Sequence, residues 1–113
     1  MDLDLLKDYC DAKPGAYPDF PFDEVTLTYR VGGKIFLICS IDKFEFVNLK
    51  CSPEQAIELR DQYPDSVLPG YHMNKKNWNS VYPNRAMSDT EIFKLIDISY
   101  DLIVKSLPVD KRP

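Results

Sequence analysis

The sequence predicts a single α+β domain over residues 1–113, with helices packed on one face of an antiparallel sheet. The length of 113 residues, with 44% hydrophobic and 28% charged residues, suits one globular domain. The apolar residues change from helical spacing near the N-terminus to alternation after residue 24, and they return to helical spacing after residue 88. Turn-forming segments separate these stretches, which gives the order α-β-β-β-α-β-β-α.

The N-terminal residues 2–11 predict a short amphipathic helix. Their apolar stripe recurs at helical spacing and comprises Leu3, Leu6 and Cys10. Two acidic residues precede or begin this stripe, which suits the positive end of a helix dipole. The proline-rich segment 13–22 that follows predicts an irregular connection to the sheet.

Alternating apolar residues predict three strands of an antiparallel meander. The first strand runs from residue 25 to residue 31, and the glycine pair at 32–33 forms a two-residue turn because glycine adopts positive φ freely. The second strand covers residues 34–41. A turn at residues 42–43 leads to the third strand, residues 44–51.

The register that these two turns impose assigns each side chain to one face of the sheet. Tyr29 then faces Phe36, and Phe36 faces Leu49. The predicted core face comprises Val25, Leu27, Tyr29, Phe36, Ile38, Val47 and Leu49. The opposite face collects Cys39 and further apolar residues, which are Ile35, Leu37, Ile41, Phe44 and Phe46. This apolar outer face requires either cover by later elements or a partner, which is a second copy or another protein.

Two capping boxes predict the remaining helices. In each, a serine N-cap is followed three residues later by glutamine or glutamate: Ser52 with Gln55, and Ser88 with Glu91. The first of these helices is predicted to end near residue 62, and the second is the main core helix and ends before Pro108. Two extended segments, residues 67–73 and 78–82, are predicted between them.

Charge and cysteine content limit the possible functions. With 14 basic and 18 acidic residues, the net charge is -4, so a nucleic-acid role would need a local basic patch. Three cysteines without a C-x-x-C spacing indicate neither a disulfide framework nor a zinc site, and we expect no metal and no cofactor. No signal peptide or membrane-length apolar run is present, so we expect a cytoplasmic protein without a membrane association.

The densest group of aromatic and polar residues lies in segment 69–81, which holds the only histidine and the only tryptophan. Lysines there could neutralise phosphates, asparagines could hydrogen-bond bases, and aromatic rings could stack on an exposed base. The candidate nucleic-acid-binding residues are Lys50, Tyr71, His72, Asn74, Lys75, Lys76, Trp78 and Asn79. Residue types alone favour the alternative that the aromatic residues pack on the sheet, the asparagines form turns and the lysines keep a hairpin soluble.

Catalysis has little support in the sequence. A general base needs a nucleophile and an orienting partner, and no nucleophile motif accompanies His72. Cys51 precedes a predicted helix N-terminus, where the pKa of a thiol can fall, but the register places it at a strand end on the core face. We therefore expect no catalytic residue and no enzyme.

Several sequence blocks carry a family resemblance. They are Lys13-Pro14-Gly15-Ala16, Asp19-Phe20-Pro21-Phe22, Tyr29-Arg30-Val31-Gly32-Gly33-Lys34-Ile35-Phe36, Leu49-Lys50-Cys51-Ser52-Pro53-Glu54, Leu59-Arg60 and Ile96-Asp97-Ile98-Ser99-Tyr100-Asp101-Leu102. The most specific is Pro69-Gly70-Tyr71-His72-Met73-Asn74-Lys75-Lys76 with Trp78-Asn79-Ser80-Val81. With these blocks, nearly the whole chain resembles the MmcQ/YjbR family of small bacterial proteins.

The resemblance implies a compact α+β domain similar to type III secretion chaperones and frataxin-like sheets. The family is usually described as DNA-binding, so DNA is an implied partner. The basic residues available for a local patch are Arg30, Lys34, Lys50, Lys75 and Lys76. The alternative function is a protein-interaction or chaperone-like domain that uses the outer sheet face. Convergence of the basic residues on one surface would favour DNA, and an apolar outer face without nearby lysines would favour a protein.

Overall fold

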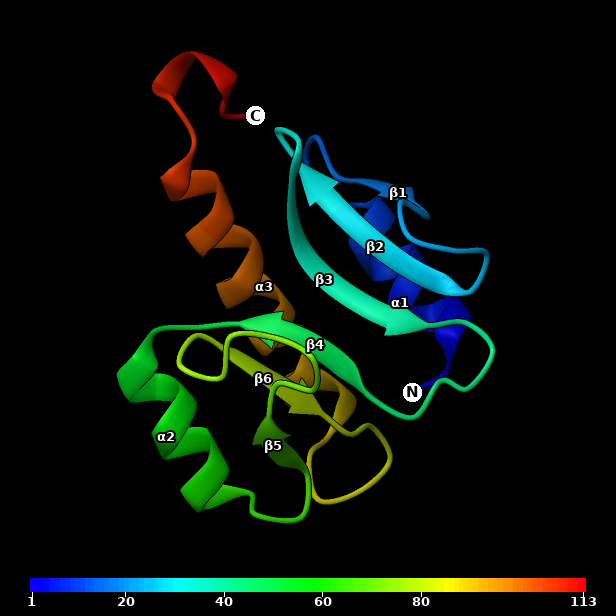
Figure 1. Cartoon of the computed structure of the whole chain (residues 1–113), viewed down its shortest axis with the longest axis vertical. Coiled ribbons are helices and arrows are strands. Elements are labelled where there is room, and N and C mark those ends of the chain that lie inside the picture. The colour runs from blue at the N-terminus through cyan, green and yellow to red at the C-terminus, as the bar shows by residue number, and fades with distance from the viewer.

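The computed structural model describes residues 1–113 and confirms the α+β class. Three α-helices accompany a six-stranded antiparallel sheet with the order β1-β2-β3-β4-β6-β5 (Figure 1). The elements, in chain order, are α1 (Leu3–Asp11), β1 (Tyr17–Asp19), β2 (Thr26–Val31), β3 (Lys34–Ser40), β4 (Val47–Lys50), α2 (Pro53–Gln62), β5 (Val67–Pro69), β6 (Trp78–Val81), α3 (Asp89–Ser106) and a 3₁₀-helix (Val109–Lys111). No helix combines the length and the apolar character that a bilayer crossing requires.

The helices pack on one face of the sheet, and the opposite face carries none (Figure 1). The rings of Tyr9 in α1 and Phe93 in α3 stack 4.0 Å apart, which joins these two helices. At the other end of the sheet, the carbonyl of Ala56 in α2 accepts a hydrogen bond from Asn79 Nδ2 of β6 at 3.3 Å. The side of the sheet without helices is called the outer face below.

The structure contains one strand that the sequence does not predict. β1 lies in the proline-rich segment and pairs antiparallel with β2. Pro18 fits there because an edge strand needs no hydrogen-bond donor on its outer side. An ion pair fastens the end of the strand, since Arg30 Nε lies 2.9 Å from Asp19 Oδ2.

The two serine caps form as predicted. Ser88 Oγ accepts a hydrogen bond from the N–H of Glu91 at 3.2 Å, and Glu91 Oε1 accepts one from the N–H of Ser88 at 3.0 Å, which completes a capping box. At α2, Ser52 Oγ accepts from the N–H of Gln55 at 3.2 Å, so half of that box is present.

The register between β2 and β3 differs from the predicted one. The glycine turn is confirmed, with φ of 59° at Gly32 and 83° at Gly33. Beyond it, the ladder contains an irregularity next to Tyr29, which pairs with Leu37 instead of Phe36. The loop before β4 is also longer than predicted, because β4 begins at residue 47. Val31 pairs with Lys34 as the turn predicts, but beyond the irregularity the predicted pairing of β3 is wrong by one residue.

This shift exchanges the two faces of β3, because side chains alternate along a strand. Leu37 was predicted on the outer face, but it is 0% exposed and belongs to the core together with Cys39. Ile38 was predicted in the core and pairs with outer-face residues instead. Phe36 stays buried as the extra residue of the bulge, and its ring meets that of Tyr100 edge-on at 5.4 Å. Leu37 therefore contributes to no partner surface.

The other four residues of the predicted partner surface do not form one continuous patch. Ile41 is exposed, and Ile35 is half-buried. Phe44 packs against the core cluster. Phe46 lines a pocket, and it is the one residue of the four that does so.

A serine of α3 holds β3 and β4 together where their ladder ends. The two strands pair over three residues, and the last pair joins Leu37 to Leu49. At the next position, the fully buried Ser99 Oγ donates to the carbonyl of Phe36 at 2.5 Å and accepts from the N–H of Lys50 at 2.9 Å. The hydroxyl therefore replaces a direct ladder bond and anchors α3 to both halves of the sheet.

Candidate binding site on the outer sheet face

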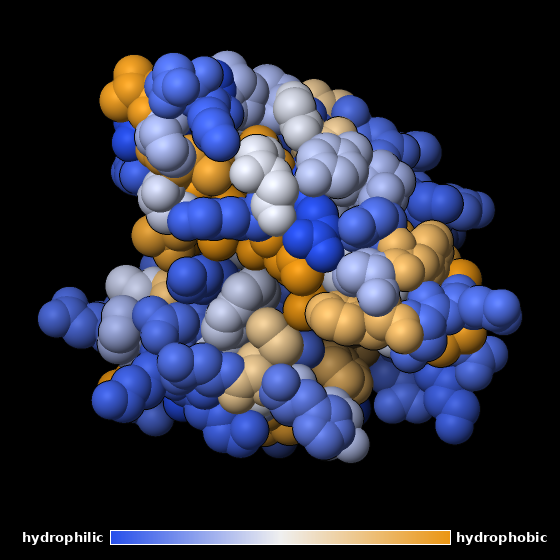
Figure 2. Space-filling view, turned by 45° about the horizontal axis from the view of Figure 1, so that its top comes forward, coloured by the Kyte–Doolittle hydropathy of each residue, from blue (hydrophilic) through white to orange (hydrophobic).

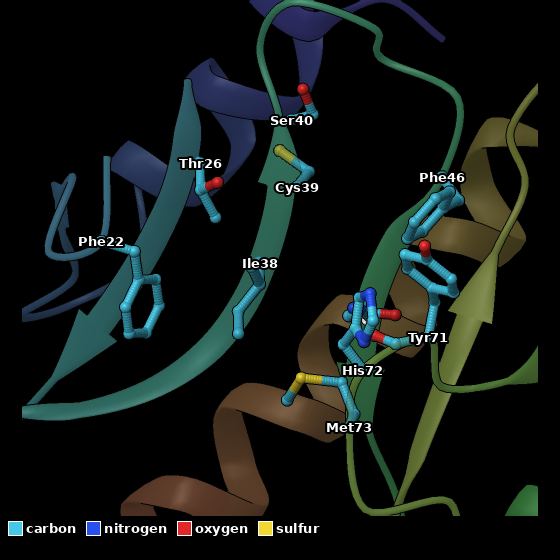
Figure 3. Close-up of a pocket in the computed structure, with 10 residues that line it drawn as sticks. Phe22, Thr26, Ile38, Cys39, Ser40, Phe46, Tyr71, His72 and Met73 are labelled. Atoms are coloured by element: carbon cyan, nitrogen blue, oxygen red, sulfur yellow. Dashed lines mark hydrogen bonds between the residues drawn. The ribbon is translucent and has the colours of Figure 1, made fainter. Parts of the chain in front are cut away.

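A pocket of about 330 Å³ opens on the outer face, over the junction of β3 and β4. Ile38 and Asn48, which are cross-strand partners, lie at this junction. Figure 3 shows the residues that line the two sides of the pocket. One side consists of Phe22, Thr26, Ile38, Cys39 and Ser40, and the other consists of Phe46, Tyr71, His72 and Met73. Figure 2 shows apolar side chains gathered in the central part of the molecule's surface, with hydrophilic side chains around them. The lining is mostly apolar, with few polar groups, as in many ligand sites.

Two buried polar residues fix the loop that forms one wall of the pocket. Asn48 of β4 and Ser80 of β6 are cross-strand partners, and they are 5% and 1% exposed. Ser80 Oγ donates to Asn48 Oδ1 at 2.6 Å and accepts from the N–H of Tyr71 at 2.9 Å. Asn48 Nδ2 donates to the carbonyl of Tyr71 at 3.2 Å. We call this pair the Asn48–Ser80 latch, since it binds both backbone polar groups of Tyr71 to the sheet.

The residue after the latched position has an uncommon backbone conformation. His72 has a φ of 57°, in the left-handed region that non-glycine residues rarely adopt. The N–H of Met73 donates to the carbonyl of Gly70 at 3.2 Å, which closes a turn around His72. Backbone strain of this kind persists only where the surroundings enforce it, and it concentrates at functional sites.

Aromatic rings continue from this turn along the pocket wall. The ring of His72 lies 4.0 Å from that of Tyr71, and Tyr71 meets Phe46 edge-on at 5.8 Å. Phe46 also contacts Tyr82, with ring centroids 5.4 Å apart. The wall is therefore a set of mutually supported rings.

Gly70 is required at the start of the loop by close approach. A Cβ atom there would lie 2.9 Å from both the Cβ and the carbonyl oxygen of Trp78, and 3.0 Å from the Cβ of Met73. Any side chain at this position would push the pocket wall away from β6. This contact explains the Pro-Gly sequence that precedes the aromatic residues.

Arg60 of α2 holds the other end of the same loop. Its Nε donates to Asn79 Oδ1 at 2.7 Å, and its Nη2 donates to the carbonyls of Trp78, at 3.3 Å, and of Lys75. Asn79 was predicted to contact nucleic acid, but it is 2% exposed on the core side and binds Ala56 and Arg60. That prediction is wrong, because Asn79 pairs with core residue Leu49 and faces the helices.

The other predicted site residues separate into two groups. Tyr71 and His72 line the pocket, and both are exposed at their outer edges. Lys50 is the cross-strand partner of Trp78 at the end of β4 and β6, and the loop before Trp78 carries the exposed residues Asn74, Lys75 and Lys76. Asn74 serves as a turn residue, since its Oδ1 accepts from the N–H of Lys76 at 3.1 Å.

Two cations of the expected basic patch are engaged within the chain. Arg30 pairs with Asp19, and Lys34 Nζ donates to Ser106 Oγ of α3 at 3.3 Å. Lys75 Nζ donates to the carbonyl of Gly70 at 3.2 Å and keeps its charge unpaired.

Sequence reasoning did not identify the latch or Arg60. Asn48 is not among the candidate residues of the sequence analysis, and Arg60 enters it only within the family resemblance. The available signal was weak: a polar residue in the middle of each of two short strands.

Three ionisable groups in or near this part of the sheet have pKa values shifted by their surroundings. Burial raises the pKa of the Cys39 thiol to about 12, and burial also raises the pKa of Cys51. The carboxylate of Asp23 accepts hydrogen bonds from the N–H groups of Thr26 and Val25 and from Thr26 Oγ1, and these bonds lower its pKa. Asp23 is therefore an anion beside the pocket at neutral pH. No group of three or more His, Cys, Asp or Glu side chains lies where it could hold a metal ion.

Comparisons with known proteins match almost the whole chain. A family model described as YjbR matches residues 11–102. The YjbR protein of Escherichia coli (strain K12) is 37% identical over 113 residues, which cover 99% of this chain and 95% of that protein. The YyaQ protein of Bacillus subtilis (strain 168) is 31% identical, with 88% of this chain and 94% of that protein covered.

Solved structures match the fold as well. The crystal structure of Deinococcus radiodurans protein DR2400, a DUF419 domain, has a TM-score of 0.91 and 32% sequence identity, covering 97% of this chain and 84% of that one. The crystal structure of a protein from Pseudomonas syringae has a TM-score of 0.76 and 26% identity, covering 91% of this chain and 99% of that one.

The latch predicts a stability and exchange effect. Replacing Asn48 by alanine leaves the carbonyl of Tyr71 and the hydroxyl of Ser80 without their buried partner. We expect the free energy of unfolding in urea to fall by about 1–3 kcal/mol. The same substitution should also accelerate hydrogen exchange at the amide of Tyr71. The control is Asn77→Ala in the adjoining loop, and equal effects of the two substitutions would contradict the role of the latch.

Proposed function

The chain belongs to the YjbR family, and we propose that it is a binding domain without catalytic chemistry of its own. Its outer-face pocket receives one ring-sized apolar group that belongs to a protein partner. The observation that carries this proposal is a preformed, mostly apolar pocket on the face of the sheet that no helix covers.

The size and lining of the pocket favour a single ring. Its volume of about 330 Å³ is at the lower end of the roughly 300–1,000 Å³ typical of ligand sites. Ile38 offers an apolar surface on one side, and the rings of Phe46, Tyr71 and His72 offer edges and faces on the other. Offset and edge-to-face contacts between aromatic rings contribute roughly 0.5–1.5 kcal/mol beyond their buried area.

The wall of the pocket is ordered before any ligand arrives. The Asn48–Ser80 latch and the Arg60 contacts hold both ends of the loop from Gly70 to Trp78. Ordering a flexible loop at the moment of binding would reduce affinity, and a wall already in place avoids that cost. This arrangement supports a recognition role for the outer face.

The absence of catalytic chemistry is part of the proposal. Cys39 borders the pocket, but its side chain belongs to the core, and burial raises the pKa of its thiol to about 12, so the thiol is neutral at physiological pH. His72 contacts the ring of Tyr71, and a general base would need a carboxylate to orient it. The ionisable side chains at the pocket therefore favour a role in ligand binding over a role in catalysis.

Filling the pocket tests the proposal. We expect random peptides displayed on phage and selected on the immobilised protein to converge on sequences with one aromatic residue. Ile38→Trp should weaken binding of a selected peptide at least about tenfold, because the indole occupies the space of the incoming ring. Fluorescence anisotropy of the labelled peptide measures the effect.

The matched control is Leu68→Trp, which adds the same indole to β5 at a residue that is 38% exposed and does not line the pocket. Thermal unfolding checks that both variants fold. Selected peptides without an aromatic or large apolar anchor, or equal binding to both variants, would refute this function.

Nucleic-acid binding is a second candidate, and the grouping of Lys50, Lys75 and Lys76 with Trp78 favours it. The N–H of Cys51 donates to the carbonyl of Asn77 at 2.8 Å, which holds the lysine loop beside the end of β4. Lysines could contact phosphates there while the indole stacks on a base. The net charge of -4 limits this candidate to local contacts. Both candidates fit the cytoplasmic location expected from the sequence.

Charge reversal tests the second candidate. Lys75→Glu with Lys76→Glu should abolish binding of single- and double-stranded DNA, and binding by the unmodified chain should weaken steeply as salt rises. Trp78 emission, as the only tryptophan signal, reports the titration. The control reverses the charge of two exposed lysines of α3, with Lys94→Glu and Lys105→Glu. Equal losses in the two double variants, or no binding at low salt, would eliminate DNA as the ligand.

A further inference from the structure

Acidic residues gather at one end of the outer face. Thr26 pairs with Ser40, and the N–H of Ile41 donates to the carbonyl of Val25 at 2.8 Å. The segment before β2 and the loop after β3 therefore lie at the same end of the sheet. The exposed acids of these two segments are Asp23, Glu24, Asp42 and Glu45, and we call them the acidic end. It adjoins the pocket, since Thr26, whose hydroxyl bonds to Asp23, lines it.

Basic residues gather at the opposite end of the sheet. β4 and β6 run antiparallel from the pair Val47–Val81 to the pair Lys50–Trp78. The basic end consists of Lys50, Lys75 and Lys76, and it lies where this ladder finishes. The pocket lies between the two ends and nearer the acidic one, because Ile38 and Asn48 are interior residues of their strands and Thr26 and Ser40 also line it.

No residue of either end forms an ion pair within the chain, and the acidic end stays net negative although the exposed Lys43 lies between Asp42 and Glu45. The ion pairs of the chain lie elsewhere: Lys13 with Asp97, Arg30 with Asp19, and the N-terminus with Asp89. Hydrogen bonds from the backbone hold the pKa of Asp23 below its usual value, so this anion persists at neutral pH. Charges that remain unpaired beside a binding site contribute to the choice and orientation of a partner.

We propose, resting on the function proposed above, that the occupant is an extended segment of a partner protein with a central aromatic residue. The aromatic side chain enters the pocket. A basic flank lies over the acidic end, and an acidic flank lies over the basic end.

Two other occupants fit the charges less well. A nucleic-acid strand carries phosphates on both sides of any base, so one side would meet Asp23 and its acidic neighbours. A second copy of this chain, placed face to face, would bring two hollows together and leave both pockets without a ring. A polypeptide can carry opposite charges on the two sides of one aromatic residue.

The test uses three labelled peptides that share a central phenylalanine. One has lysines on one side and glutamates on the other, one has serine and glycine on both sides, and one has glutamates on both sides. We expect the first to bind roughly fivefold more tightly than the neutral peptide at low salt, since each exposed ion pair contributes modestly. Reversing part of the acidic end, with Asp42→Lys and Glu45→Lys, should remove that advantage and leave the neutral peptide unaffected.

The control reverses two exposed acids away from the outer face, with Asp101→Lys and Asp110→Lys. Equal affinity for all three peptides, each still blocked by Ile38→Trp, would overturn the charge proposal and leave the pocket function intact. Failure of every peptide to bind would overturn both. Displacement of the peptide by oligothymidine, or concentration-dependent dimerisation that Ile38→Trp abolishes, would replace the polypeptide with a nucleobase or a second copy as the occupant.

Discussion

The hydrogen bonds between the Asn48–Ser80 latch and the backbone of Tyr71 determine the form of the outer face. They satisfy two buried sheet side chains and both polar groups of one loop residue at the same time. The left-handed turn at His72 and the ring contacts of Tyr71 follow from that fixed position. Without the latch, Tyr71 would have no polar attachment to the sheet, and the pocket wall that it forms would depend on the contacts at the two ends of the loop.

The opposite side of the sheet supports the same junction. Ser99 of α3 occupies the point at which β3 and β4 stop pairing, so one buried hydroxyl ties the main core helix to both halves of the sheet. Ile38 and Asn48 pair at this junction, and Asn48 also attaches the loop wall through the latch. The base of the pocket and one of its walls therefore depend on the same part of the sheet.

Sequence patterns predicted the elements better than their faces. The Ser52 and Ser88 caps and the glycine turn are local signals, and each formed where the sequence placed it. The bulge at Phe36 has no local signature, and its one-residue shift moved Leu37 into the core and Ile38 onto the outer face. Asn79 was misplaced for a related reason: its partners Arg60 and Ala56 belong to a helix whose position a sequence pattern does not reveal. The latch likewise joins residues 32 positions apart, so tertiary structure alone could identify it.

The central claim is that the outer-face pocket, between an acidic and a basic end, is the binding site of this YjbR-family chain. Amide chemical-shift mapping with N-acetylphenylalaninamide tests it directly, because this probe carries the ring and no charged flanks. The account predicts saturable shifts confined to the amides around Ile38, Asn48 and His72. Shifts centred on the helical face, or scattered without saturation, would contradict it.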